Sequence, residues 1–527
     1  MSKNRIVFII GLLALIWPLA GGAQEGPPQD QSQGKALSLT LNDTIARALK
    51  NNLGVRAAVL SPQVAEAALA QAGEKYYPTL SFSYARQDNA NASYSFLDAT
   101  GNYTTKGNNY SSSISQQIPF GGQFSVSVTG GMTDTTQRAV TINPRYNGQL
   151  RFNFSQPLLQ GFGYTASQFN ILIARNSYDS SELQFYKTVQ DTVYSATQAY
   201  WGLVYSIENL KVQRLALQLA KELLVQNQHS VEIGTLAPMD ILSAQSEVAN
   251  REASIIAAEA AVKNSEDQMK TLINLSPEEE KGLTSIATLD QPAYEEMKVD
   301  LDQALALAMQ KRPDLKISQI GLKTQDLSLS NAKNQLLPNL NFNASYWSPG
   351  VAGTQILYDN PLFGNVIGRV PGSASQAMKD AFNFKYKNWS LGLSLSIPLS
   401  NMISRAAVAQ AQLNQQQAIL NLKNQEQQVV LEIKTAVRNV QTTYQQVQSY
   451  KVARELAEQK LQAEQEKLRV GQSTNYFVLQ YQRDLTNARV LELNAIINYN
   501  LAQVALDRST GTILEKKNIK ISEINPQ

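Results

Sequence analysis

The sequence predicts a mixed α and β membrane protein, in which a transmembrane β-barrel continues into a long α-helical coiled-coil barrel. The first observation is a heptad seam, a row of apolar residues spaced alternately by three and four, which occurs twice. The second is a set of segments in which apolar and small polar residues alternate, as in strands. The third is that both patterns recur in the same order, so an internal duplication is predicted.

Composition narrows the functional classes. The 527 residues include 46 Lys and Arg against 43 Asp and Glu, with no Cys and one His. This near balance of charge gives no electrostatic reason to expect nucleic acid as a partner. With no thiol, and with His229 as the one imidazole, neither a zinc site nor an iron–sulfur site is expected, and no cofactor is indicated.

The N-terminal segment has the features of a secretion signal. Lys3 and Arg5 precede the apolar run IVFIIGLLALIWPLA, and small residues follow as far as Ala23. Residues 1–23 are therefore predicted to be a signal peptide. The alternative, a membrane anchor, is disfavoured because the run is short and a proline interrupts it. No Cys follows the predicted cleavage point, so lipidation at an N-terminal cysteine is not expected.

Each repeat is predicted to begin with a helix of about 35 residues. The openings LTLNDTIARALKNNLG and VDLDQALALAMQKRPD align without gaps, and the helical periodicity that follows them ends at Pro78 and Pro338. In chain order, the prediction is a flexible segment, a first repeat, a linker, a second repeat and a tail, at residues 24–37, 38–275, 276–297, 298–511 and 512–527.

Strands are predicted directly after the two prolines. Leu80, Phe82 and Tyr84 alternate with serines, and Trp389 and Leu391 begin a longer alternation with Ser and Gly. Segments of nine to eleven residues with one apolar and one small polar face are typical of a transmembrane β-barrel. The alternative is the edge of a soluble β-sandwich, which the signal peptide disfavours. The segments RQDNANASYSFLDATGNYTTKGNN and SPGVAGTQILYDNPLFGNVIGRVPGSASQAMKD are interpreted as long outer loops.

Each repeat then contains a long helix and a shorter returning helix. A glycine ends each long helix, which at about 1.5 Å per residue would be roughly 100 Å long. The leading and returning helices together match one long helix in length, so stacked end to end they could flank it. The predicted ranges are 167–233 and 404–470 for the long helices, and 239–275 and 476–511 for the returning ones. One chain has too few strands to close a barrel, which indicates cyclic assembly.

The order of these motifs resembles the TolC family of outer-membrane efflux channels. The similar motifs are the duplicated LxxAlxxAL opening, the LPxLxxxxxY strand start, the SQPL and SIPL strand ends, and the glycine turns EIGTLAPMDILSAQSEV and RVGQSTNYFVLQYQRDLTNAR. The resemblance implies a homotrimer in the outer membrane of a Gram-negative bacterium, in which a lipid-embedded β-barrel continues into a periplasmic helical tunnel.

The same resemblance implies a function without bond chemistry. Such a channel is a passive exit duct that docks to a periplasmic adaptor protein and to an inner-membrane transporter of the RND or ABC type. Its periplasmic tip opens when the second-copy helix pair moves outward. Two other readings of the sequence are a secreted coiled-coil structural or adhesive protein and a porin acting alone. No enzyme is expected, because His229 has no catalytic partner at motif spacing.

Two features depart from the family pattern. The segment ISQQIPFGGQFSVSVTGG, near residues 114–130, is a candidate hairpin beyond the usual four strands per protomer, or an ordered loop. Family members often place an inward-facing acid after the second glycine turn. Here Phe477 stands at the position that matches Asp240 of the first copy, so an acidic constriction from that segment is not expected.

The candidate site residues lie at the two glycine turns. The resemblance implies an adaptor-docking tip made of Gly234, Leu236, Leu242, Gly471, Val478, Leu479 and Arg483. The alternative for these residues is turn geometry and coiled-coil core. Asp240 and Phe477 are hypotheses for a pore or gate, against the alternatives of helix capping for the acid and interhelix packing for the ring.

Overall fold

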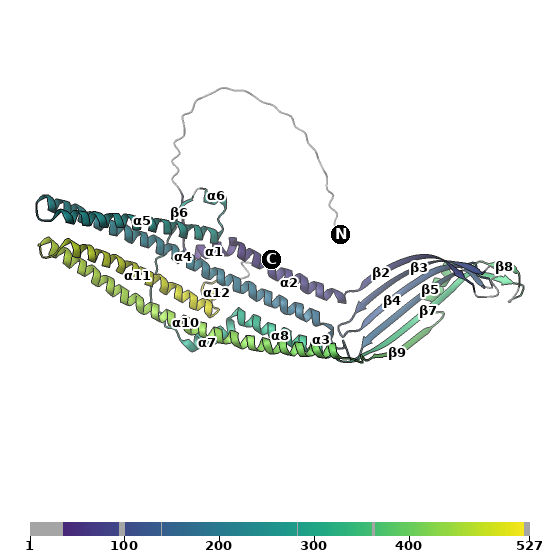
Figure 1. Ribbon diagram of the computed structural model, residues 1–527. Helices are drawn as coiled ribbons and strands as arrows, with labels where there is room; N and C mark the ends of the chain where they lie inside the picture. The colour runs from purple at the N-terminus through teal and green to yellow at the C-terminus, as the bar shows by residue number, and fades with distance from the viewer. Residues whose placement is uncertain (1–34, 94–100, 139, 282, 361–363, 521–527) are drawn as a thin grey trace, which may run out of the picture.

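The structure, a computed structural model, describes residues 35–93, 101–138, 140–281, 283–360 and 364–520. The predicted signal peptide lies outside the described residues. Within them the chain is elongated, with a β-sheet at one end and the closed ends of two helical hairpins at the other (Figure 1). This arrangement confirms the mixed α and β class, whereas the trimer and the duplication stay predictions.

The first half of the chain forms a long helix flanked by shorter ones. Helix α4 (Phe169–Glu232) packs against α2 (Leu53–Gly73) over its sheet-side half and against α5 (Pro238–Ile273) over the other half (Figure 1). This is the end-to-end stacking that the matched helix lengths indicate. The remaining short elements of this half are α1, η1 and α3, at Leu41–Asn51, Glu74–Tyr76 and Tyr164–Ser167.

The second half repeats this order of elements. Helix α10 (Met402–Arg469) is flanked by α8 (Pro313–Asn334) and α11 (Asn475–Ser509), and α7 (Leu301–Lys311) precedes α8. The leading helix is broken in both halves, although the sequence predicts one helix of about 35 residues.

The break has a different local cause in each half. In the first half the Oδ1 atom of Asn52 accepts from the backbone N–H groups of Gly54 and Val55, which starts a new helix. In the second half Pro313 occupies the first position of α8, where its missing N–H group is tolerated. Each leading helix is therefore two helices in sequence.

The heptad seams form the interior of the helical region. In α4 the seam residues Val193, Ala196, Tyr200 and Leu203 are buried, and in α10 the buried seam residues are Ile433, Val437, Val440 and Val447. Each group belongs to a separate hydrophobic cluster, one built on α4 and the other on α10. The apolar repeat thus identifies the helix faces that pack.

Three segments differ from their predicted roles. Residues 35–37, predicted to be flexible, belong to β1 (Lys35–Leu39), which pairs in parallel with β6 (Leu283–Thr288) inside the predicted linker. The linker also contains α6 (Pro277–Glu280). The predicted tail contains α12 (Ile513–Lys516), because Ile513 and Leu514 are buried against the α4 cluster. These elements are too short for a sequence period to be recognised.

Tyr200 connects α4 to this small sheet. Its side chain is buried, and its hydroxyl donates to Oδ2 of Asp290 at 2.8 Å and accepts from the Asp290 N–H at 3.1 Å. The same carboxylate accepts from the N–H of Leu41 at 2.6 Å. Burial raises the pKa of the Tyr200 hydroxyl to about 12, so the group stays protonated as a donor.

Replacing Tyr200 with phenylalanine is expected to lower the free energy of unfolding by about 1–2 kcal/mol, because the half-buried carboxylate of Asp290 loses one of its two hydrogen-bond donors. Urea unfolding followed by circular dichroism measures the effect. Tyr205→Phe, farther along α4, is the matched control and should be close to neutral. Equal stability of the two variants would show that the Tyr200 hydroxyl contributes nothing.

The large sheet has seven strands among the described residues. In spatial order β2, β3, β4, β5 and β7 are neighbours, and both β8 and β9 pair with the far edge of β7. All pairs in it are antiparallel. The strand bounds are Thr79–Ala92, Asn102–Gln117, Gln123–Thr135, Ile142–Pro157, Asn339–Tyr358, Val366–Val370 and Asn388–Ser396.

The candidate hairpin near residues 114–130 is part of this sheet. Strands β3 and β4 turn through residues 118–122 and lie between β2 and β5. The segment interpreted as the first outer loop is therefore largely strand, since it contains the end of β2 and the start of β3. The second loop segment likewise contains the end of β7, all of β8 and most of helix α9 (Ala374–Phe382).

The register aligns side chains of one kind on each face. One row of opposed residues runs through Leu80, Ile114, Val126, Phe152, Tyr346 and Trp389. The next row on the opposite face runs through Ser81, Ser113, Ser127, Arg151, Trp347 and Asn388. We refer to the first as the apolar face and to the second as the polar face. In the described residues, no helix is long and apolar enough to cross a membrane.

Candidate functional site at the helical tip

The candidate site residues gather where the two helical hairpins end side by side (Figure 1). The α4–α5 turn has Gly234 at φ 81°, and the α10–α11 turn has Gly471 at φ 77°. In each turn a backbone N–H reaches back to the end of the long helix, from Thr235 to Ser230 at 2.9 Å and from Gln472 to Lys467 at 2.8 Å. Both glycines therefore have the left-handed conformation of a helix C-cap.

Replacing Gly471 with alanine is expected to destabilise the second turn by about 1 kcal/mol, because a Cβ is disfavoured at positive φ. Asparagine tolerates this conformation better than alanine, so Gly471→Asn is the matched control. Amide hydrogen exchange at the tip would report the change. Equal protection in the two variants would contradict the assignment of the cap to backbone conformation.

The apolar residues of the predicted docking tip separate into two environments. Leu242 is 61% exposed and Leu236 is half-buried. Val478 and Leu479 are buried in a small cluster with Leu223 of the other hairpin, and also with Leu461 and Leu485. Val478 and Leu479 thus occupy the coiled-coil core, whereas Leu242 is available at the surface.

Arg483 links the two hairpins through a carboxylate. Its Nε and Nη2 atoms donate to Oε2 of Glu247 on α5, at 2.9 and 2.6 Å. The second oxygen of Glu247 accepts from Nε of Arg251 at 2.8 Å. The Glu247 side chain is only 3% exposed, and its hydrogen bond raises the pKa of Arg483. We call the contact between Arg483 and Glu247 the tip lock.

Glu247 is not among the residues singled out from the sequence. It lies three residues after Ala244, and both are buried on the same face of α5. An acidic residue at a buried helix position requires a cationic partner. The position of Glu247 on the buried face of α5 is therefore the sequence signal that could have indicated an ion pair here. The partner itself lies 236 positions away in the chain, so no local pattern identifies it.

Asp240 participates in the tip through its backbone. Its carbonyl oxygen accepts from Nδ2 of Asn227 on α4 at 3.4 Å and from Nδ2 of Asn475 on α11 at 3.3 Å. Both asparagines are almost fully buried. Three helices from two hairpins therefore meet at one carbonyl, while the Asp240 carboxylate lies in the first turn of α5.

Phe477 belongs to an aromatic cluster on α11. Its ring lies edge-on to Tyr476, with centroids 5.6 Å apart, and 6.3 Å from Tyr481. The ammonium group of Lys460 lies over Tyr481 at 4.0 Å. Phe477 is 43% exposed, so part of the ring is free to meet another surface.

Side-chain hydrogen bonds also stabilise the α10–α11 turn. Ser473 donates to Oε1 of Glu464 at 2.5 Å, and Lys467 donates to Oε2 at 3.2 Å. The Ser473 hydrogen bond holds the pKa of Glu464 below its usual value. These contacts fix the segment after Gly471 to the end of α10.

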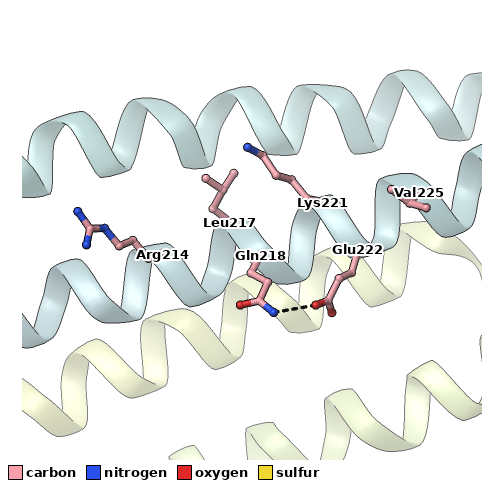
Figure 2. A pocket seen from close by; sticks show the side chains of 6 residues that line it. All are labelled: Arg214, Leu217, Gln218, Lys221, Glu222 and Val225. Atoms are coloured by element: carbon pink, nitrogen blue, oxygen red, sulfur yellow. Dashed lines mark hydrogen bonds between the residues drawn. The ribbon is translucent and has the colours of Figure 1, made fainter.

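A groove runs along α4 in the tip half of the molecule (Figure 2). It has a volume of about 550 Å³, and all the labelled lining residues come from this one helix: Arg214, Leu217, Gln218, Lys221, Glu222 and Val225. Because a single helix lines it, the groove is an exposed seam rather than an enclosed site. In the part of the chain that the structure covers, no cluster of His, Cys, Asp and Glu could hold a metal ion.

Comparisons with known proteins agree with this architecture. The outer membrane protein TolC of Escherichia coli K12 is 25% identical over 338 residues, which cover 63% of this chain and 64% of that protein. This chain thus spans less than two thirds of that relative. TolC of Vibrio cholerae is 21% identical over 367 residues, 69% of this chain and 76% of that protein.

Solved structures share the fold. The Campylobacter jejuni CmeC outer membrane channel superposes with a TM-score of 0.63 at 16% identity, covering 92% of this chain and 90% of the other. The outer-membrane channel OprN gives 0.64, also at 16% identity, with 90% of each chain covered. The sequence model of the outer membrane efflux protein family matches residues 123–275 and 304–512. The chain therefore belongs to the outer membrane efflux protein family.

Proposed function

We propose that this chain is one subunit of a passive outer-membrane exit duct, which carries substrates from an inner-membrane transporter across the periplasm and the outer membrane. The observation that carries the proposal is the joining, in one chain, of a two-faced sheet to a helical rod. The apolar face suits lipid and the polar face suits a water-filled lumen. A stand-alone porin would not need the rod, and a secreted adhesive protein would not need the apolar face.

Closure of the barrel requires further copies of the chain. Among the described residues, one edge of the sheet is β2, and the other is β9 with the short β8 beyond it; β2 runs away from the helices and β9 returns to them. In a ring, β2 of one subunit would therefore pair antiparallel with β9 of the next, which removes both exposed edges. A homotrimer with six long strands per subunit would close a barrel of 18 strands.

The helical rod also presents surfaces that suit neighbouring subunits. Leu420, Leu431 and Leu456 of α10 are 66%, 66% and 59% exposed. The groove along α4 in Figure 2 is similarly open. In a trimeric tunnel such apolar seams would be covered by helices of the adjacent subunits, because apolar surface of this extent is unfavourable in water.

Gating would occur at the tip. The tip lock and the asparagine contacts to Asp240 hold the α10–α11 hairpin against the α4–α5 hairpin. Opening by outward movement of the α10–α11 hairpin would have to break these contacts, which supports our interpretation of the described conformation as a closed state. We propose that a periplasmic adaptor binds the turns at Gly234 and Gly471 and the exposed Leu242, and that an RND or ABC transporter supplies the energy.

The proposal is tested on the purified full chain. Electron microscopy in detergent should show trimers with a barrel joined to a tunnel of roughly 100 Å. A photo-crosslinker at Thr235 or Gln472 should capture a periplasmic adaptor in cells. A soluble monomer would contradict the proposal, and a trimer that never crosslinks to an adaptor while its transporter is expressed would favour the porin reading.

A further inference from the structure

Helix α9 lies across the apolar face of the sheet. It rests on opposed glycines, since Gly148 pairs with Gly350 across β5 and β7. A Cβ at Gly148 would lie 2.7 Å from Sδ of Met378, and one at Gly350 would collide with the carbonyl of Ala377. Ala377 and Ala381 are fully buried. The helix backbone is therefore seated directly on the strands, as a fixed part of this surface.

A residue just after the end of α9 anchors the helix to the same face. Phe384 has φ 51°, at a C-cap position where glycine is usual and a larger residue is disfavoured by about 1 kcal/mol. Its ring stacks on Phe152, with centroids 6.4 Å apart, and lies 5.7 Å from Tyr346. The aromatic contact offsets the unfavourable backbone conformation and explains why a ring is present there.

Helix α9 crosses the strands where the apolar face ends, on the side of the sheet that is farther from the helical region. On β7, ten residues separate Gly350 from Leu340 near the helical end, which is about 33 Å along the strand. With the usual strand tilt this is a height of about 25 Å, the thickness of the apolar band in outer-membrane barrels. Farther from the helices than the row that contains Gly148 and Gly350, the same face of β2 carries the charged residues Arg86 and Asp88.

The outward side of α9 and the residues after it combine aromatic and basic side chains. Phe382 and Tyr386 are each 50% exposed, and Trp389 at the start of β9 is 70% exposed. Lys379 and Lys387 are exposed beside them. Aromatic rings concentrate at membrane–water interfaces, and lysines close to the surface attract anionic lipid headgroups.

We propose that α9 is an interfacial helix, and that Lys379 and Lys387 bind phosphate groups of lipid in the outer leaflet. This inference rests on the proposed function, because it requires the apolar face to meet lipid. Lys385 is not assigned this role, since its Nζ atom pairs with Asp380 at 2.9 Å. The paired lysine instead stabilises the end of the helix.

The depth of α9 can be measured with single cysteines, because the chain has none of its own. A nitroxide at Phe382→Cys in the reconstituted protein should lie at headgroup depth, and one at Leu391→Cys, which pairs with Ala344 near the middle of the apolar band, should lie deep in the hydrocarbon. A label at 382 that is wholly in water, beside a deep label at 391, would overturn the inference alone. Water exposure of both labels would overturn the proposed barrel as well.

Phosphate recognition is tested with diphosphorylated lipid A and its dephosphorylated form, titrated separately into the detergent-solubilised full chain. Preferential binding of the phosphorylated form is expected, and Lys379→Gln with Lys387→Gln should weaken it about tenfold. Lys423→Gln on α10 is the control and should change nothing. Equal binding of the two lipids, or an equal effect of the double variant and the control, would overturn the proposal. Unchanged oligomer size excludes misfolding as the cause.

Discussion

Replacing Arg483 with alanine is expected to open the helical tip of the proposed trimeric channel. The substitution removes both hydrogen bonds that cross from α11 to Glu247 on α5. Glu247 keeps Arg251, which is on its own helix, so the carboxylate stays partly compensated while the connection between hairpins is lost. The variant therefore weakens the contact between the hairpins that we propose to hold the closed state, without leaving an isolated buried charge.

The change in the free energy of opening depends on how many tip locks the assembled channel contains, one in each subunit. A hydrogen bond to a charged group contributes about 1.5–3 kcal/mol. The Arg483 side chain is 55% exposed, so solvent screening reduces this to about 1 kcal/mol. Three locks opening together in a trimer would amount to about 3 kcal/mol, which is roughly a hundredfold change in the ratio of open to closed channels.

Single-channel recording in planar bilayers would measure this change as a higher open probability. In cells, the same variant should admit a bulky antibiotic that the closed channel excludes. Arg489→Ala is the matched control, because Arg489 pairs with Glu458 inside the α10–α11 hairpin at 2.9 Å, and among the described residues it pairs with no other hairpin. If Arg483→Ala and Arg489→Ala conduct alike while both form trimers, the tip lock does not hold the gate.

Whether a feature of this molecule can be predicted from its sequence depends on how local its signal is. The long helices follow from a heptad period that each segment contains by itself, and seam residues such as Val193 and Ile433 are buried as expected. The tip lock has no such signal, because Arg483 and Glu247 are brought together only by the packing of two hairpins. The arginine could be singled out by its position in a turn motif, but its partner could not.

The strands show the same limit. Strand β9 alternates Trp and Leu with Ser and Gly, and its period of two is plain. Strand β3, NYTTKGNNYSSSISQQ, is polar on both faces over most of its length, so its sequence resembles a loop. It is a strand because β2 and β4 satisfy its backbone groups on both sides. Tertiary pairing, not local preference, decides its conformation.

The inserted β3–β4 hairpin is expected to widen the barrel. Four strands per subunit would give 12 strands in a trimer, whereas six give 18. Barrel diameter grows roughly linearly with strand number, so the lumen of the β-domain should be about 1.5 times as wide. A high-resolution structure of the trimer in lipid would count the strands directly, and a barrel of 12 would show that the hairpin lies outside the wall.

Removing residues 102–135 is expected to restore the narrower barrel. Leu80 of β2 and Phe152 of β5 lie in the same row of the sheet, with Ile114 and Val126 between them. Deleting the hairpin would make these strands neighbours with their apolar faces on the same side, since the period-two alternation is preserved. The cross-section of the barrel should then fall to roughly half.

This change is measurable only where the helical tip no longer limits the current. The deletion is therefore made in the Arg483→Ala background, and polymer exclusion applied from the outer side reports the width of the β-domain. The cutoff should shift to smaller polymers after deletion. The matched control exchanges Ser111 and Ser113 for threonine, which keeps the hairpin and its small polar face. An unchanged cutoff in a deletion variant that still forms trimers would mean that β3 and β4 do not line the lumen, because strands that form part of the wall cannot be removed without reducing its circumference.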